Sequence, residues 1–252
     1  MTGIRVLQMS EQRIVTIHQP DFMPWLGFFL KAYRANVFVV LDHVVNNVKD
    51  GSWFRRVRLL VSGRPSWISI PLIRPESGPF QQLKEMKICN DAGARRLFNK
   101  YLRSFEQSYS RAPFYKEYKG LFFDYFKFLE ENNSLVHNNM RFIKEVFALL
   151  GIDAKVVYSS QLGVYGKKTE LLINIVKTVG GDVYLCGDGA ADYQDNSMFE
   201  SAGLTVLRNN FIPVCYKQVG AAEFVPGLSV LDALMNLGSD GVKQMLEVYC
   251  KP

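Results

Sequence analysis

A histidine at the junction of an apolar strand and a proline-rich turn is the first candidate for chemistry. Residues 18–27 read HQPDFMPWLG and follow the β-branched run IVTI. That run favours a buried strand over 14–19, and the prolines enforce a turn before a helix expected over about 25–35. His18 then lies near a helix N-terminus, where an imidazole can transfer protons and free N–H groups attract anions. We expect Gln19 and Trp25 to contact a substrate; a histidine bonded only to a backbone carbonyl is the alternative.

An acidic residue ends the second apolar run. Asp42 follows VFVVL at 37–41, a strand without polar alternation. If the two strands are parallel neighbours, their carboxyl ends meet and Asp42 lies beside His18. It would then orient the imidazole, accept a sugar hydroxyl or hold a magnesium ion. A turn or helix cap is the alternative.

Basic side chains that could bind a diphosphate occur in three places. Arg56 and Arg58 share one face of a predicted strand, where two guanidiniums suit a diphosphate or carboxylate; a solvated sheet edge is the usual explanation of such a basic run. Lys167 and Lys168 precede a helix start, without the spacing of a P-loop. Lys31, on the first predicted helix, is the remaining candidate.

A glycine turn follows another apolar strand. The sequence CGDGAADY begins at Cys186, and Gly187 permits positive φ and close approach to a ligand. Asp188 and Asp192 are candidates for binding hydroxyls, an ammonium or a metal, with Tyr193 beside them. Cys186 lies inside the strand, which favours a buried and unreactive thiol.

Strand and helix patterns alternate at both ends of the chain. This order predicts an α/β fold with a mostly parallel, doubly wound (Rossmann-like) sheet. The run 57–62 and the run 66–72 flank Gly63-Arg64-Pro65, which predicts a small hairpin, and 86–89 is a candidate strand. We expect one domain over 1–252, with a helical insertion at about 91–150. The remaining predicted strands and helices are 37–42, 154–160, 169–179, 182–187, 196–203, 204–210 and 228–238.

Composition narrows the class of protein. No apolar run approaches the roughly 20 residues of a membrane helix, and charges interrupt the N-terminus, so we expect a cytoplasmic protein with peripheral membrane association left open. The four cysteines form no CxxC pair and the three histidines are scattered, so no structural metal site is expected. A net charge of +6 fits an anionic small molecule, with nucleic acid the least expected partner.

The ordered motifs resemble one family. HQPxxxPWxGFFxK, the Trp-x-x-Arg segment and SWISIPL are similar to the N-terminal half of the WbqC-like proteins. YLCGDGAADY, PVCYKQ and LSVLDALMNLG are similar to their second half, so the resemblance spans about 14–240. The family often has Gln at Val45, Asn at Arg55 and a small residue at Cys186, which weakens Cys186 further as a nucleophile.

The resemblance implies a role in bacterial surface-polysaccharide (O-antigen-type) biosynthesis. It suggests an acyl or aminoacyl (glycyl) transferase whose acceptor is an amino sugar carried on a nucleotide or lipid diphosphate. His18 would be the base, oriented by Asp42, and Asp188 and Asp192 would hold hydroxyls or the ammonium. Two alternatives stay open: a nucleotide-dependent ligase or nucleotidyltransferase using ATP and magnesium, and a non-catalytic binding protein of the same machinery. The sequence specifies no cofactor and no oligomeric state.

Overall fold

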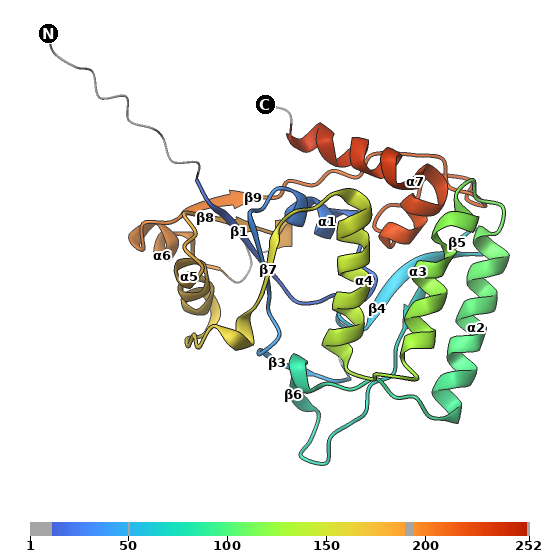
Figure 1. The fold of residues 1–252 in the computed structure, drawn as a ribbon, viewed down its shortest axis with the longest axis horizontal. Coiled ribbons are helices and arrows are strands. Elements are labelled where there is room, and N and C mark those ends of the chain that lie inside the picture. The colour runs from blue at the N-terminus through green and yellow to red at the C-terminus, as the bar shows by residue number, and fades with distance from the viewer. Residues whose placement is uncertain (1–11, 50, 190–193, 251–252) are drawn as a thin grey trace, which may run out of the picture.

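A five-stranded parallel sheet forms the centre of the molecule (Figure 1). The structure is a computed structural model, which describes residues 12–49, 51–189 and 194–250. All four strand pairs are parallel, which confirms the predicted α/β, Rossmann-like sheet. In sheet order the strands are β7 (Lys155–Tyr158), β2 (Val37–Val40), β1 (Ile14–His18), β8 (Val183–Cys186) and β9 (Thr205–Arg208).

The order of these strands reverses beside β1. Counted along the chain, the sheet reads third, second, first, fourth, fifth. The connections after β1 therefore lead toward one edge of the sheet, and the chain later returns to place β8 on the other side of β1. Where connections diverge in this way, a crevice opens beyond the carboxyl ends of the two central strands.

Both faces of the sheet are covered, because side chains alternate along its strands. On β2, Phe38 and Val40 face the larger core cluster, which contains apolar side chains of α1 (Leu26–Tyr33) and α4 (Leu135–Leu150). Val37 and Val39 face the smaller cluster, with α5 (Lys168–Thr178) and α6 (Asn196–Ser201). The sheet is thus doubly wound, which explains why its strands read as continuous apolar runs.

Three helices between the sheet strands form the predicted insertion. They are α2 (Ala92–Tyr109), α3 (Tyr115–Phe128) and α4. Caps bound two of these helices: the Asp91 carboxylate accepts from Ala94 N at 2.7 Å at the start of α2, and Gly151 ends α4 with a φ of 64°. Phe122 of α3 stacks on Phe105 of α2 with ring centroids 4.1 Å apart, so aromatic side chains pack the helices together.

A buried carboxylate fastens the C-terminal helix α7 (Val230–Glu247) to the insertion. Asp232 accepts hydrogen bonds from the Tyr109 hydroxyl at 2.9 Å, the Tyr216 hydroxyl at 2.7 Å and Gln218 Nε2 at 2.8 Å. The Tyr109 oxygen also accepts from Leu60 N at 3.0 Å. Four segments therefore meet at one polar cluster, in which Tyr109, Gln218 and Asp232 are buried and Tyr216 is partly buried.

The smaller sheets agree only partly with expectation. The hairpin of β4 (Arg56–Val61) and β5 (Arg64–Ser69) is confirmed. The pairing of β3 (Val45–Asn47) with β6 (Phe80–Gln82) was not predicted. The candidate strand at 86–89 is wrong: these residues make only isolated bridges, because Ile88 and Lys87 meet two different segments. Short 3-10 helices cover Leu83–Glu85, Ser159–Gln161 and Val248–Cys250.

None of the helices in the described part of the chain combines the length and apolar character needed to cross a membrane.

Replacing Tyr109 by Phe tests the buried cluster. The substitution removes one hydroxyl and leaves the Leu60 N–H and one Asp232 oxygen short of a partner. We expect the free energy of unfolding to fall by about 1–3 kcal/mol, measured by urea denaturation. Tyr101→Phe is the matched control, since its partly buried hydroxyl bonds Ser69 through longer contacts of 3.2–3.3 Å that water can replace. Equal losses in both variants would contradict the assigned importance of the cluster.

Candidate functional site

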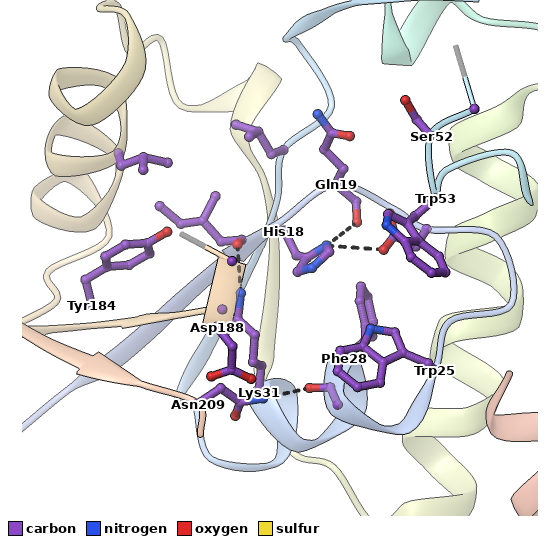
Figure 2. A pocket seen from close by; sticks show the side chains of 18 residues that line it. His18, Gln19, Trp25, Phe28, Lys31, Ser52, Trp53, Tyr184, Asp188 and Asn209 are labelled. Atoms are coloured by element: carbon purple, nitrogen blue, oxygen red, sulfur yellow. Dashed lines mark hydrogen bonds and ion pairs between the residues drawn. The ribbon is translucent and has the colours of Figure 1, made fainter. Parts of the chain in front are cut away.

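A cavity of about 690 Å³ opens at the carboxyl ends of β1 and β8 (Figure 2). This is the crevice at which the strand order reverses, so the ligand site of an open α/β sheet is expected here. His18 and the turn Gly187–Gly189 both line it, so the predicted convergence of these two segments is present. The other polar or aromatic lining residues are Gln19, Asp21, Trp25, Phe28, Lys31, Ser52, Trp53, Tyr184 and Asn209.

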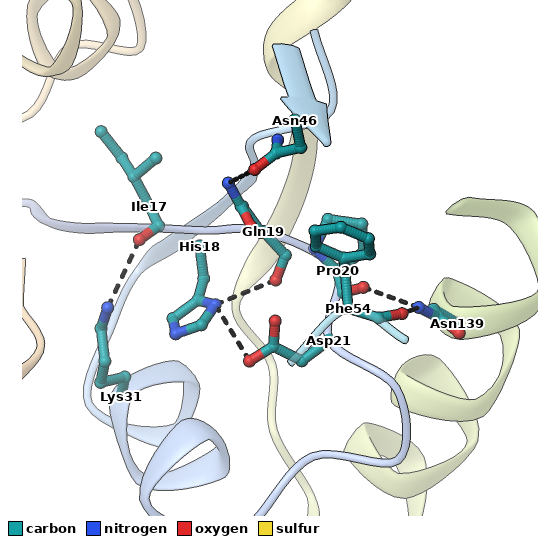
Figure 3. Close-up of polar contacts among 9 residues, drawn as sticks. All are labelled: Ile17, His18, Gln19, Pro20, Asp21, Lys31, Asn46, Phe54 and Asn139. Carbon is teal, nitrogen blue, oxygen red and sulfur yellow. Dashed lines mark hydrogen bonds and ion pairs between the residues drawn. The ribbon is translucent and has the colours of Figure 1, made fainter. Parts of the chain in front are cut away.

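The hydrogen bonding of His18 defines which ring nitrogen is free. Nδ1 lies 2.9 Å from the carbonyl oxygen of Gln19. A carbonyl oxygen can only accept, so Nδ1 carries the proton and Nε2 keeps its lone pair. Nε2 points away from that carbonyl (Figure 3). Burial and then the charge of Lys31 lower the pKa of His18 to about 3, so the imidazole is neutral at physiological pH.

Asp21 is the carboxylate beside His18. Its Oδ2 lies 3.8 Å from His18 Nδ1 (Figure 3), and the residue is 5% exposed. Burial raises the pKa of Asp21 to about 8, and the charge of Lys31 acts in the opposite direction. When ionised, this group stabilises an imidazolium. Asp21 was not among the predicted site residues, although it lies in the same proline-bounded turn as His18.

The expected pairing of Asp42 with His18 is wrong. The Asp42 carboxylate accepts from Ser159 Oγ at 3.0 Å, Ser160 N at 2.9 Å and Ser160 Oγ at 2.7 Å. It therefore joins the end of β2 to the 3-10 helix after β7, the neighbour of β2 on the side away from β1. His43 Nδ1 also contacts Ser159 Oγ at 2.6 Å. Ser159 thus lies between the Asp42 carboxylate and the His43 imidazole, but it is buried and cannot act as a nucleophile on a substrate.

The predicted basic residues divide between the cavity and the surface. Lys31 lines the cavity. Arg56 does not; its guanidinium lies 4.3 Å from the Trp67 ring centroid, on the face it shares with Arg58. Lys167 and Lys168 are exposed at the start of α5 and also lie outside the cavity lining. Asp192 and Tyr193 lie outside the described residues.

The glycine turn shapes one wall of the cavity. Asp188 accepts from Asn210 N at 2.7 Å and Phe211 N at 3.2 Å, so its carboxylate holds the loop after β9 against the turn. Gly187 and Gly189 line the cavity without placing a side chain in it. Burial raises the pKa of the Cys186 thiol, which agrees with the expectation of an unreactive cysteine.

An asparagine from the helical insertion supports the His18 turn (Figure 3). Asn139 Nδ2 donates to the carbonyls of Pro20 and Phe54, both at 2.8 Å, while its Oδ1 accepts from the Tyr125 hydroxyl at 2.7 Å. The residue is fully buried. The Pro20 carbonyl lies in an irregular turn, where no helix or strand provides a donor, so Asn139 on α4 supplies one. Nothing in the local sequence around Asn139 indicates this role.

The spacing of Trp25 and Gly27 has a steric cause. Trp25 precedes α1, and its ring folds back over Gly27 so closely that a Cβ there would lie 2.5 Å from a ring carbon. The ring also meets Phe211 edge-on, with centroids 5.1 Å apart. Gly27 therefore allows Trp25 to line the cavity while it contacts the loop after β9.

The state of His18 is directly measurable. We expect long-range ¹H–¹⁵N spectra to show the Nδ1–H tautomer, unchanged between pH 7 and pH 5, because burial holds the pKa of His18 near 3. His18→Gln identifies the signal by its disappearance. A titration with a midpoint near the ordinary histidine value of about 6.5 would contradict the burial described here.

Substitution of Gly27 tests its contact with Trp25. Alanine in a helix is ordinarily preferred over glycine by about 1 kcal/mol. Here we expect Gly27→Ala to lower the free energy of unfolding by about 1–3 kcal/mol, because its Cβ overlaps the indole. In a Trp25→Ala background the same change should become neutral or stabilising. Unfolding of the two single variants and the double variant measures the coupling; additive effects would disprove the contact.

Comparison with known proteins finds similarity over nearly the whole chain. A family model, that of the WbqC-like protein family, matches residues 19–244. The chain is also similar to an uncharacterized protein of Mycobacterium tuberculosis (strain ATCC 25618 / H37Rv), with 25% identity over 238 residues, covering 94% of this chain and 98% of that protein. No solved structure matches significantly. The chain therefore belongs to the WbqC-like protein family.

Proposed function

We propose that this protein transfers an acyl or aminoacyl (glycyl) group to the amine of a nucleotide- or lipid-linked amino sugar, in the biosynthesis of a bacterial surface polysaccharide of the O-antigen type. One observation carries the proposal. His18 offers an unprotonated Nε2 at the cavity of the central crevice, while its Nδ1 is held by the Gln19 carbonyl. An attacking amine must lose a proton, and a neutral imidazole fixed in this tautomer can take it. The expected cytoplasmic location is part of the same proposal.

The proposed transfer has two bond changes and two proton transfers. The sugar nitrogen attacks the carbonyl carbon of an activated donor, forming the C–N bond, and its proton passes to His18 Nε2. The bond from the carbonyl carbon to the donor's leaving sulfur or oxygen then breaks, and the imidazolium returns the proton to that leaving atom. Asp21, when ionised 3.8 Å from Nδ1, stabilises the imidazolium. A space of about 690 Å³ is adequate for a sugar and the reacting end of a donor.

The low pKa of His18 makes its imidazole a weak base. The positive charge of Lys31 contributes to that low value. An anionic substrate group beside Lys31 would offset this charge and raise the pKa of His18 toward the range that suits a general base. The proposed base is therefore strongest when a charged substrate is bound.

The strand order supports a rival function, a nucleotide-dependent ligase or nucleotidyltransferase, because nucleotides bind at this crevice in many doubly wound sheets. Against it, the turn after β1 carries two prolines and no glycine before α1 begins, so it lacks the glycine-rich phosphate loop. Thermal stabilisation by ATP with magnesium, and none by acyl donors, would favour the rival. A non-catalytic binding protein would bind an amino sugar and turn over none.

His18→Gln tests the proposed base. With candidate amino sugars and acyl or aminoacyl donors, we expect kcat to fall by about 10²–10⁴-fold, the usual contribution of a general base, while the KM for the acceptor changes little. His43→Gln is the matched control, since that histidine lies outside the cavity lining and should retain turnover. Both variants are first compared by thermal unfolding. Unchanged turnover in His18→Gln would eliminate the base assignment.

A further inference from the structure

Lys31 places an ammonium group in the protein interior, where the described residues form no ion pair with it. The residue is 4% exposed, and its side chain runs from the last turn of α1 back to the carboxyl end of β1. There Nζ donates to the carbonyl oxygen of Ile17 at 3.3 Å, which leaves two of its three N–H groups (Figure 3). Asp21 and Asp188 favour its charged form, but within the described residues neither lies at ion-pair distance. A buried cation with so few partners is costly to the folded state.

The space around this ammonium is open to a ligand. Lys31 and the turn Gly187–Gly189 line the same cavity (Figure 2). A Cβ at Gly187 would lie 3.8 Å from Nζ, and a Cβ at Gly189 would meet no atom within 4 Å. The missing side chains therefore leave room beside the ammonium. Asn209, 2% exposed, also lines the cavity, and its buried Oδ1 has no hydrogen-bond partner among the described residues.

We propose that Lys31 is the residue that binds a phosphate group of the substrate at the floor of the cavity, next to the Gly187–Gly189 turn. An ammonium is a compact point charge with three donors, and lysine is a common phosphate ligand. The bound anion supplies an ionic partner that Lys31 does not find among the described residues. The inference refines the proposed function by locating the phosphate of a carrier-linked sugar within reach of His18, while phosphate binding itself does not depend on the reaction.

Lys31→Met tests the proposal through two effects of opposite sign. Without ligand, we expect the variant to be as stable as the wild type or more stable, because an unpaired buried charge is replaced by an apolar side chain of similar length. With sodium pyrophosphate at constant ionic strength, the wild type should show a saturable rise in its unfolding temperature. The variant should bind pyrophosphate at least about tenfold more weakly, since a charge-assisted hydrogen bond is lost. Lys100→Met, an exposed lysine on α2, is the matched control and should respond as the wild type does.

Lys31→Gln separates charge from packing, because an amide can still donate to the Ile17 carbonyl. We expect it to lose the pyrophosphate response too. The proposal is overturned if pyrophosphate does not stabilise the wild type, if either Lys31 variant responds normally, or if both are markedly less stable without ligand, which would make the ammonium a structural tie. Acetate at equal ionic strength should give no saturable response; an equal one would assign the site to anions in general.

Two further arms identify the carrier and separate this inference from the proposed reaction. Uridine diphosphate and geranyl diphosphate share the diphosphate and differ in the group attached to it. Whichever binds the wild type more tightly identifies a nucleotide or a lipid carrier, and this binding should be lost in Lys31→Met. His18→Gln should still bind pyrophosphate. Binding that depends on Lys31 in a protein without transfer activity would refute only the transferase; transfer without such binding would refute only the phosphate site.

Discussion

Parallel pairing of β1 with both β2 and β8 is the constraint on which the site depends. Because the chain leaves β1 toward one edge of the sheet and returns on the other side, no crossover segment covers the carboxyl ends of β1 and β8. The turn after β1 and the glycine turn after β8 become the two walls of a cavity. Period-two alternation on β1 places His18 on the same face as Thr16, opposite Val15 and Ile17, so the imidazole meets Phe28 of α1 with ring centroids 4.7 Å apart.

That location shields three ionisable groups from water, Asp21 and Lys31 more completely than His18, and the signs of their pKa shifts show the effect on stability. The pKa of His18 falls from 6.5 to about 3, so its contribution to stability is complete above pH 6.5 and is lost as the pH falls toward 3. The pKa of Asp21 rises from 3.8 to about 8, so its contribution is present below pH 3.8 and lost as the pH rises through 8. The pKa of Lys31 falls from 10.5 to about 8, so its charged form at neutral pH lowers the stability of the folded state. Such strain at one cavity is typical of a site adapted to a ligand.

The helical insertion has a mechanical part in holding this cavity together. Helix α4 supplies Asn139, whose amide satisfies carbonyls on both the Pro20 turn and the Phe54 segment. Helix α2 supplies Tyr109, which connects β4 to α7 through Asp232. Both contacts are buried and fully hydrogen-bonded, which makes the arrangement of these segments specific. The insertion thus stabilises the wall of the cavity that the sheet alone does not provide.

Local patterns in the sequence determined the strands, the helices and the small hairpin, because apolar periodicity, proline and glycine act over a few residues. The caps at Asp91 and Gly151 follow from the same local chemistry. Parallel order also placed His18 and the glycine turn at one edge of the sheet. Only the tertiary structure decided which polar groups face each other there. Asp42 turns to Ser159 and Ser160 rather than His18, because strand neighbours and side-chain directions depend on contacts across more than a hundred residues. Asp21, three residues after His18, takes the expected place. The β3–β6 pairing and the support from Asn139 are long-range in the same sense, and no local signal specifies them.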